Sequence, residues 1–383
     1  MKAGLLRSAG RIRVVAWKEL IQLRRDRLTI GMMVMLPILQ LCLFGYAIDT
    51  DVRHMPTVVL DGDQTAASRD LARRMAATGY YDLVGRTDSY DDIGRAFRSN
   101  TARVALVVPP RFGADLTRGR PAQLQLLVDG SDPQTVASAT NTAASLVATL
   151  AGEQTAGAAQ RAGLPAPSGP PVSLELSVLY NPDLRTAVYI VPGLVGVILT
   201  LTMVMFTSMA IVRERERGTL EQLIVSPVKS VELVVGKILP YVVAGYVQMA
   251  LILTAGAVIF DVTIVGDLRL LFLLASLFIA GNLALGLFFS TVAKTQQQAM
   301  QMSFFFLLPN ILLSGFVFPW EGMPRFAQFL SQGLPLTHFL RIIRGVVLKG
   351  AVYGELHDEV VWLALILGAL VTMTALRFRK KLG

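Results

Sequence analysis

The chain has 383 residues, of which 53% are hydrophobic and only 16% are charged. This composition is too apolar for a single soluble domain and favours a protein that crosses a membrane several times. The formal net charge of +9 does not indicate a nucleic-acid-binding protein, because Lys and Arg gather near the N-terminus, in a loop that begins at Arg213, and at the C-terminus. Basic residues accumulate in this way on the cytoplasmic side of membrane proteins. The single cysteine, Cys42, lies in an apolar run, which excludes a disulfide framework and a cysteine-based metal site.

The first 48 residues form an amphipathic segment followed by an apolar one. Residues 8–27 interleave Arg and Lys with apolar side chains and Trp17, a pattern typical of a helix that lies in the membrane interface. A cleaved signal peptide is the alternative, but no small-residue cleavage site follows and the charged part is too long. We therefore expect residues 1–27 to form a cytoplasmic interfacial helix and residues 28–48 to form the first span, since about 20 apolar residues cross a bilayer.

Residues 49–184 have the composition of a water-soluble domain. Apolar runs bounded by turn residues predict strands from Pro56 and at 81–84, 103–108, 124–128 and 172–180. Helical patterns predict helices at 68–78, 90–98 and 133–162. Because strands and helices alternate, we expect a small α/β domain outside the membrane. Asp129 and Asp132, in the sequence LVDGSDP, could belong to a metal or phosphate loop, but we favour their interpretation as turn formers.

Five further apolar segments predict spans at 186–212, 238–260, 268–293, 300–318 and 360–376. Together with residues 28–48 the chain then crosses six times, which places both termini and the loop at Arg213 on the same, positively charged side. Residues 319–350 break this charge rule on the outer side, although their apolar residues have helical spacing. Short helices that dip into the outer leaflet would satisfy both observations. The basic residues concerned are Arg325, Arg341, Arg344 and Lys349.

The segment from Arg213 to Pro227 reads RERERGTLEQLIVSP. Its alternating charges cannot remain in hydrocarbon, where each costs roughly 2.5–3.5 kcal/mol, so the chain leaves the membrane here. Thr219 can begin a short helix with Gln222 as its capping-box partner, and the apolar residues that follow then share one face. From this pattern alone, a solvated inner loop and an amphipathic helix that docks a partner both remain open.

Two stretches carry a resemblance to a known family. Residues 213–241, RERERGTLEQLIVSPVKSVELVVGKILPY, resemble the segment between the second and third spans of ABC type-2 transporter permeases, the membrane subunits of ATP-binding-cassette exporters. SGFVFPWEGMP followed by LPLTHFLRIIRGVVLKG resembles the re-entrant helices above the pore in that family. The resemblance covers nearly the whole chain and is weakest over residues 49–184, which look like the extracytoplasmic insert of one branch of these permeases. It implies an α-helical polytopic membrane protein with six transmembrane helices, an N-terminal elbow helix and an inserted α/β domain.

The resemblance also implies partners. Residues 213–230 would hold the coupling helix that fits a groove on a separate ATPase subunit, through Arg213, Glu214, Arg215, Glu216, Arg217, Gly218, Thr219, Leu220, Glu221, Leu223, Ile224 and Pro227. The sequence contains no G-x-x-x-x-G-K-[ST], H-E-x-x-H or G-x-S-x-G motif. We therefore expect a chain that is not itself an enzyme and binds no cofactor or metal, with ATP and Mg²⁺ held by two partner ATPase subunits. The second permease would be an identical copy or a paralogue, and the sequence leaves open whether a periplasmic adaptor also docks.

In this family the second and fifth spans of paired permeases line the central path. A polar amide beside a helix breaker in the fifth span, with an apolar wall of Met and Phe around it, therefore makes a candidate substrate path of Asn310, Pro309, Met203, Phe206, Phe305 and Phe306. Such a wall suits a hydrophobic or amphipathic cargo, drug-like or lipid-like, because Met adapts to varied shapes. The alternative for Asn310, as for Gln40, Gln248, Asn282 and Gln301, is a hydrogen bond between helices.

The resemblance implies an exporter subunit in a bacterial inner membrane, and the charge pattern predicts that both termini lie in the cytoplasm. A membrane signalling or mechanotransmission protein, which couples an external domain to a cytoplasmic partner without transport, is the alternative. An ion-coupled carrier is disfavoured because we expect no buried Asp, Glu, Lys or Arg inside the spans.

Overall fold

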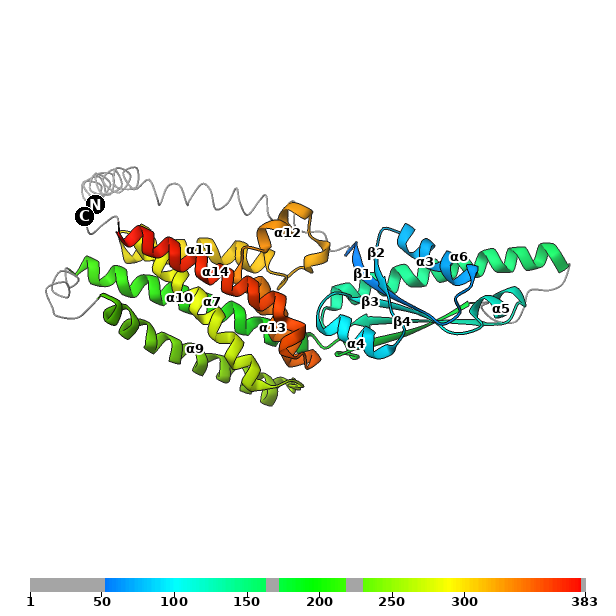
Figure 1. Cartoon of the computed structure of the whole chain (residues 1–383), viewed down its shortest axis with the longest axis horizontal. Helices are drawn as coiled ribbons and strands as arrows, with labels where there is room; N and C mark the ends of the chain where they lie inside the picture. Colours follow the sequence, from blue (N-terminus) through cyan, green and yellow to red (C-terminus); the bar gives the residue numbers. More distant parts are fainter. Residues whose placement is uncertain (1–51, 163–171, 218–229, 380–383) are drawn as a thin grey trace, which may run out of the picture.

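The computed structural model describes residues 52–162, 172–217 and 230–379. Within these ranges the chain forms an α/β domain and a bundle of long helices, placed end to end (Figure 1). The predicted interfacial helix at 1–27 and the predicted first span at 28–48 lie outside the described residues.

The α/β domain is built on a five-stranded mixed sheet with the strand order β2-β1-β3-β4-β5. β1 runs parallel to β2 and β3, β3 is antiparallel to β4, and β4 is parallel to β5. All five residues of β3, VALVV, are buried, as expected for a central strand that is covered on both faces. The strands are β1 (Met55–Asp61), β2 (Tyr81–Arg86), β3 (Val104–Val108), β4 (Ala122–Asp129) and β5 (Val172–Leu179).

Four helices cover this sheet: α3 (Ala66–Ala77), α4 (Tyr90–Arg98), α5 (Phe112–Thr117) and α6 (Pro133–Ala162). α3, α5 and α6 bury apolar side chains against one face, and α4 buries Ile93 and Phe97 against the other. Thr65 and Ser89 each accept a backbone hydrogen bond at the start of α3 and α4, which satisfies helix N–H groups that have no partner within the helix. The short helix α5 was not predicted from the sequence, and every other element here lies within two residues of its predicted bounds.

The helical bundle contains α7 (Thr186–Glu216), α9 (Ser230–Phe260), α10 (Leu268–Val292), α11 (Gln296–Leu313) and α14 (Tyr353–Arg379). Within the described ranges, four stretches are long and apolar enough to cross a membrane: Thr186–Glu216, Leu239–Phe260, Leu268–Val292 and Tyr353–Arg377. α11, in place of the fifth span predicted at 300–318, is not among them, because four glutamines and a Pro-Asn pair make it more polar.

α10 lies at the centre of the bundle and contacts α7, α9 and α14. Its side chain Phe278 stacks on Phe339 with ring centroids 4.0 Å apart. A methyl group added at Gly286 would lie 2.8 Å from the carbonyl oxygen of Val204 and 2.9 Å from Cβ of Thr207. The backbones of α7 and α10 therefore approach closely, which only glycine permits at this position.

Residues 319–350 form short helices, as predicted: η1 (Trp320–Gly322), α12 (Arg325–Ser331) and α13 (Pro335–Lys349). α13 is almost entirely buried against α7, α10 and α14. α12 exposes Phe326 and Phe329, whose exposed fractions are 74% and 76%. At its C-terminal end, α13 contacts the α/β domain through Lys349 (Figure 1).

The helix α14 is longer than the last predicted span. The span was predicted at 360–376, but α14 begins at Tyr353 and so includes Glu359, whose side chain is only 12% exposed. Glu359 directly precedes residues 360–376, so the expectation that no buried acidic residue lies inside the spans stays a prediction.

Candidate functional site

The charged run at 213–217 is the C-terminal end of α7, which continues through Glu216 with Arg217 as its cap. Arg215 donates hydrogen bonds to the carbonyl oxygens of Ser290 (2.9 Å) and Ala293, at the C-terminus of α10. A cation there stabilises carbonyl groups that have no partner within their helix. The run is therefore part of the fold and not only a solvated boundary.

A neighbouring set of contacts joins the same end of α7 to α11. Glu216 accepts hydrogen bonds from the backbone N–H of Gln296 (3.1 Å) and from its side chain (2.6 Å). Arg213 donates to Oε1 of the same glutamine at 3.1 Å. The start of the predicted coupling segment is thus fixed to the turn between α10 and α11.

The rest of the coupling segment lies outside the described residues, so the docking helix stays a prediction. This applies to Gly218, Thr219, Leu220, Glu221, Leu223, Ile224 and Pro227.

The candidate path residues on α7 and α11 do not share one surface. Met203 is buried in the bundle core beside Gly245 of α9. Phe206, one turn further along α7, is 47% exposed. Phe306 packs edge-on against Phe289 of α10 at 5.8 Å. In this conformation Met203 therefore acts in packing, Phe305, Phe306 and Pro309 are partly buried, and Phe206 is exposed, where a second chain or a cargo could reach it.

Asn310 is fully buried, directly after Pro309 in α11. Neither its Nδ2 nor its Oδ1 has a hydrogen-bond partner, so the interhelical hydrogen bond considered for it is not made within the described residues. The prediction of such a bond is confirmed for Gln248, which accepts from Thr202 of α7 at 2.8 Å. A buried amide without a partner costs roughly 1–3 kcal/mol and calls for an explanation.

A buried cluster of charges joins the α/β domain to η1 and α13. Lys349, the last residue of α13, donates hydrogen bonds to Asp129 Oδ2 (2.6 Å), the Phe97 carbonyl oxygen (2.8 Å) and Asn100 Oδ1 (2.9 Å). The side chains of Lys349 and Asp129 are only 1% and 0% exposed. All three acceptors belong to the α/β domain, so this one ammonium group connects the two parts of the chain.

Arg103, at the start of β3, extends the cluster. It donates to Asp129 Oδ2 at 2.7 Å and to Glu321 Oε1 at 2.9 Å. Burial alone would raise the pKa of Asp129, but the attraction of Lys349 and Arg103 outweighs it and holds that pKa well below its usual range. Asp129 is therefore ionised between two cations.

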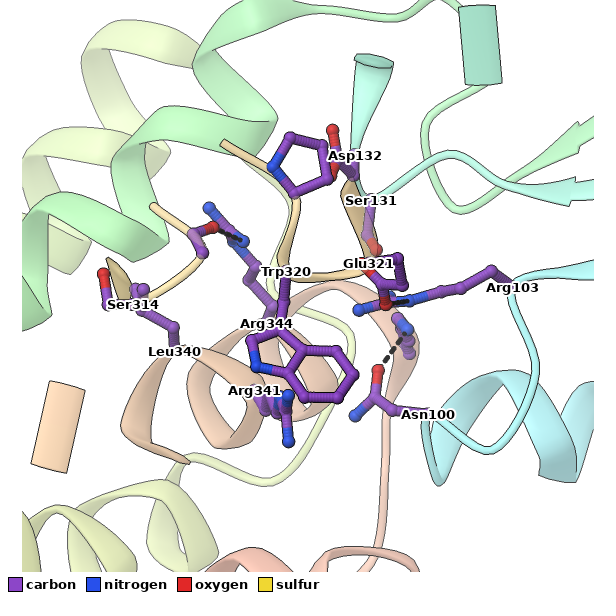
Figure 2. A pocket seen from close by; sticks show the side chains of 13 residues that line it. Asn100, Arg103, Ser131, Asp132, Ser314, Trp320, Glu321, Leu340, Arg341 and Arg344 are labelled. Atoms are coloured by element: carbon purple, nitrogen blue, oxygen red, sulfur yellow. Dashed lines mark hydrogen bonds and ion pairs between the residues drawn. The ribbon is translucent and has the colours of Figure 1, made fainter. Parts of the chain in front are cut away.

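Beside this cluster lies a small pocket between the α/β domain and α13 (Figure 2). Its accessible volume is about 20 Å³, which is enough for about one ordered water. On the helical side, Arg344 donates to the Gly315 carbonyl oxygen at 3.0 Å and lies 4.2 Å from the centre of the Tyr189 ring. On the domain side, Asp132 is buried, and burial raises its pKa against the opposing effect of Arg344.

The interpretation of Asp129 as a turn former is incomplete. Its Oδ1 does accept the backbone N–H of Ser131 at 3.0 Å, as a turn former would. Its Oδ2 bonds two cations, Arg103 within the α/β domain and Lys349 at the end of α13. The signal in the sequence was the group of basic residues within 319–350, which the predicted topology places against the charge rule. Arg341, Arg344 and Lys349 all have partners inside the protein.

Long apolar helices joined to an α/β domain define a polytopic membrane protein. Residues 27–376 match the sequence model of the family described as "ABC-2 family transporter protein". The chain is 30% identical over 334 residues to the "Probable multidrug ABC transporter permease YbhR" of Escherichia coli, covering 87% of this chain and 89% of that one. It is 28% identical over 375 residues to YbhS of the same organism, also described as a probable multidrug permease, covering 97% of each chain. The "Inner membrane transport permease YhhJ" of Escherichia coli is 28% identical over 332 residues, or 86% of each chain.

The chain belongs to the ABC-2 family of transporter proteins. It is a membrane-embedded permease, the membrane subunit of an ABC transporter.

Proposed function

We propose that this permease exports a hydrophobic or amphipathic compound, drug-like or lipid-like, from the cytoplasm or the inner leaflet of a bacterial inner membrane. Two separate ATPase subunits supply the energy, and a second permease, identical or paralogous, completes the path. The observation that carries the proposal is the match to one family over residues 27–376, which includes both the coupling segment and the outer helices.

The geometry at the end of α7 supports the coupling step. Because Arg215 and Glu216 bond the ends of α10 and α11, a force applied to residues 218–230 acts on three helices at once. Docking of an ATPase there requires both termini and this segment to lie in the cytoplasm, and the α/β domain to lie outside. In this orientation the domain contacts the outer ends of the helices through Lys349.

The nature of the cargo is inferred from two sources. YbhR and YbhS are described as probable multidrug permeases, and the side chains around the candidate path are apolar. Phe206 is exposed on α7 and Phe304 on α11, at 47% and 46%, where they could contact an apolar compound.

Transport by reconstituted vesicles tests this proposal. The permease is purified with the ATPase that accompanies it, and ATP-dependent movement of a lipophilic fluorescent dye is measured. A matched control carries Leu220→Asp and Leu223→Asp, which should remove the ATPase and the flux together. ATPase binding without flux of any apolar probe would favour the signalling alternative, and absence of a bound ATPase would overturn the proposal.

A further inference from the structure

His338, on α13, is a fully buried histidine with an acceptor at each ring nitrogen. Its Nδ1 lies 2.6 Å from Glu359 Oε2 on α14. Its Nε2 lies 2.9 Å from the backbone carbonyl oxygen of Gln332, in the turn between α12 and α13. The ring also stacks on Trp362 of α14, with centroids 5.8 Å apart and planes 10° apart.

These contacts fix the number of protons. A carbonyl oxygen can only accept, so Nε2 of His338 must carry a hydrogen. The short Nδ1–Oε2 contact needs a second hydrogen, placed either on the imidazole or on the carboxyl group, because a neutral ring has only one N–H and a carboxylate has none. His338 and Glu359 together therefore hold one proton more than a neutral histidine beside an ionised glutamate.

The surroundings favour an imidazolium paired with a carboxylate. Arg341 donates to Glu359 Oε1 at 2.9 Å, which stabilises the ionised carboxylate. Among the described residues, Glu359 and, beyond it, Arg341 are the charged groups that face the ring. α7 and α10 pack on α13 through apolar side chains such as Phe278 and Leu336.

The same group of residues reaches α12. Arg341 lies 4.7 Å from the centre of the Trp320 ring. The indole of Trp320 in turn donates to Ser331 Oγ at 2.7 Å. The contacts of His338 and Arg341 thus connect α13 with α14, η1 and the end of α12.

We propose that His338 and Glu359 form a proton-binding site, and that the bound proton stabilises the contacts of α13 with α14 and with the α12–α13 turn. With the proton present, both ring nitrogens donate. Without it, one of the two short contacts joins two acceptors and becomes repulsive, so the turn or α14 is released. The site belongs to this chain alone and does not depend on the identity of the cargo or on an ATPase.

Histidine side-chain NMR tests the proton count directly, because the chain has only three histidines. His54 and His357 have side chains 66% and 58% exposed and serve as internal references. In ¹⁵N-histidine-labelled permease, at a pH where both references show neutral rings, His338 should still show two protonated nitrogens. Loss of its second proton in step with the references would overturn the proposal.

Glu359→Gln provides the matched control, since an amide can donate to Nδ1 without an extra proton. In this variant His338 should carry a single ring proton at the same pH, and a doubly protonated ring there would contradict the assigned partner.

A spin-label distance from Phe329 on α12 to Val361 on α14, in a Cys42→Ser background, tests this stabilisation. It should broaden in the wild-type sequence as the pH rises through loss of the His338 proton, and stay unchanged in Glu359→Gln. If the distance distribution is the same in both protonation states of the wild-type site, the proton does not stabilise the contact between these elements.

Discussion

Replacing Lys349 by methionine should loosen the α/β domain from α13. The substitution keeps most of the side-chain volume and removes one ammonium group with its three hydrogen bonds, to Asp129, Phe97 and Asn100. Asp129 then remains buried with Arg103 as its remaining cation.

The expected magnitude follows from this loss. Removing one partner of a buried ion pair costs roughly 3–5 kcal/mol, because the other charge is left uncompensated. Since Arg103 still neutralises Asp129, we expect the lower end, about 3 kcal/mol. At about 1.4 kcal/mol per factor of ten, the junction should open roughly 10²-fold more often.

Hydrogen exchange of the backbone amides at residues 97–103 measures this opening in the full-length protein. Arg74→Met is the control, because its partners Asp70 and Glu153 are about half exposed and an ion pair that is open to solvent contributes little to stability. In a variant that already carries Asp129→Asn, Lys349→Met should destabilise the contact between the α/β domain and α13 less, because no buried anion then loses one of its two cations. If exchange at the junction rises no more in Lys349→Met than in Arg74→Met, the cluster does not hold the two parts together.

Three further predictions concern the proposed transport function. Leu220→Asp with Leu223→Asp should abolish co-purification of the ATPase, because the apolar docking face is lost, while the permease stays folded. A cysteine at Ser145, exposed on α6, should react with an impermeant maleimide in intact cells, whereas one at Ser226 should react only after the membrane is opened. Asn310→Leu should raise the free energy of unfolding by about 1–3 kcal/mol, because it removes a buried amide without a partner. If that amide contacts cargo in another conformation, the same variant should also transport less.

Each of these has a clear contrary result. Wild-type recovery of the ATPase with the doubly substituted segment would reject docking at residues 213–230. Labelling at Ser226 but not at Ser145 in intact cells would reverse the orientation. A more stable Asn310→Leu variant with unchanged transport would leave Asn310 as a packing residue.

The sequence predicted local structure in this protein well. In the α/β domain, strands such as VALVV at 104–108 are short apolar runs between turn residues, and they were found within two residues of their predicted bounds. Periodicity carries this information because each element satisfies its own backbone and buries its own face. The order of the strands in the sheet depends on contacts far apart in the chain and was not predicted.

The contact between the α/β domain and α13 could not be predicted from the sequence, which showed only an unexpected group of basic residues. Arg341, Arg344 and Lys349 were visible as charges that the predicted topology places against the charge rule, but their partners Glu359, Gly315 and Asp129 lie 18, 29 and 220 residues away along the chain. No periodic pattern links such positions. The start of α14 was not predicted for a related reason. The apolar run begins only after Glu359, whereas the helix begins earlier and includes Glu359, whose charge is paired with Arg341.

The close approach at Gly286 limits which parts of the bundle can move. The carbonyl oxygen of Val204 and Cβ of Thr207 occupy the space that a side chain at this glycine would need. We expect a steric clash if α7 and α10 slide past one another, and an unfilled gap if they separate. We therefore expect these two helices to travel as a single rigid block in any conformational cycle. The helices that move relative to this block are then α9 and α14, which lie at the edge of the bundle and carry exposed apolar side chains such as Leu251 and Leu365.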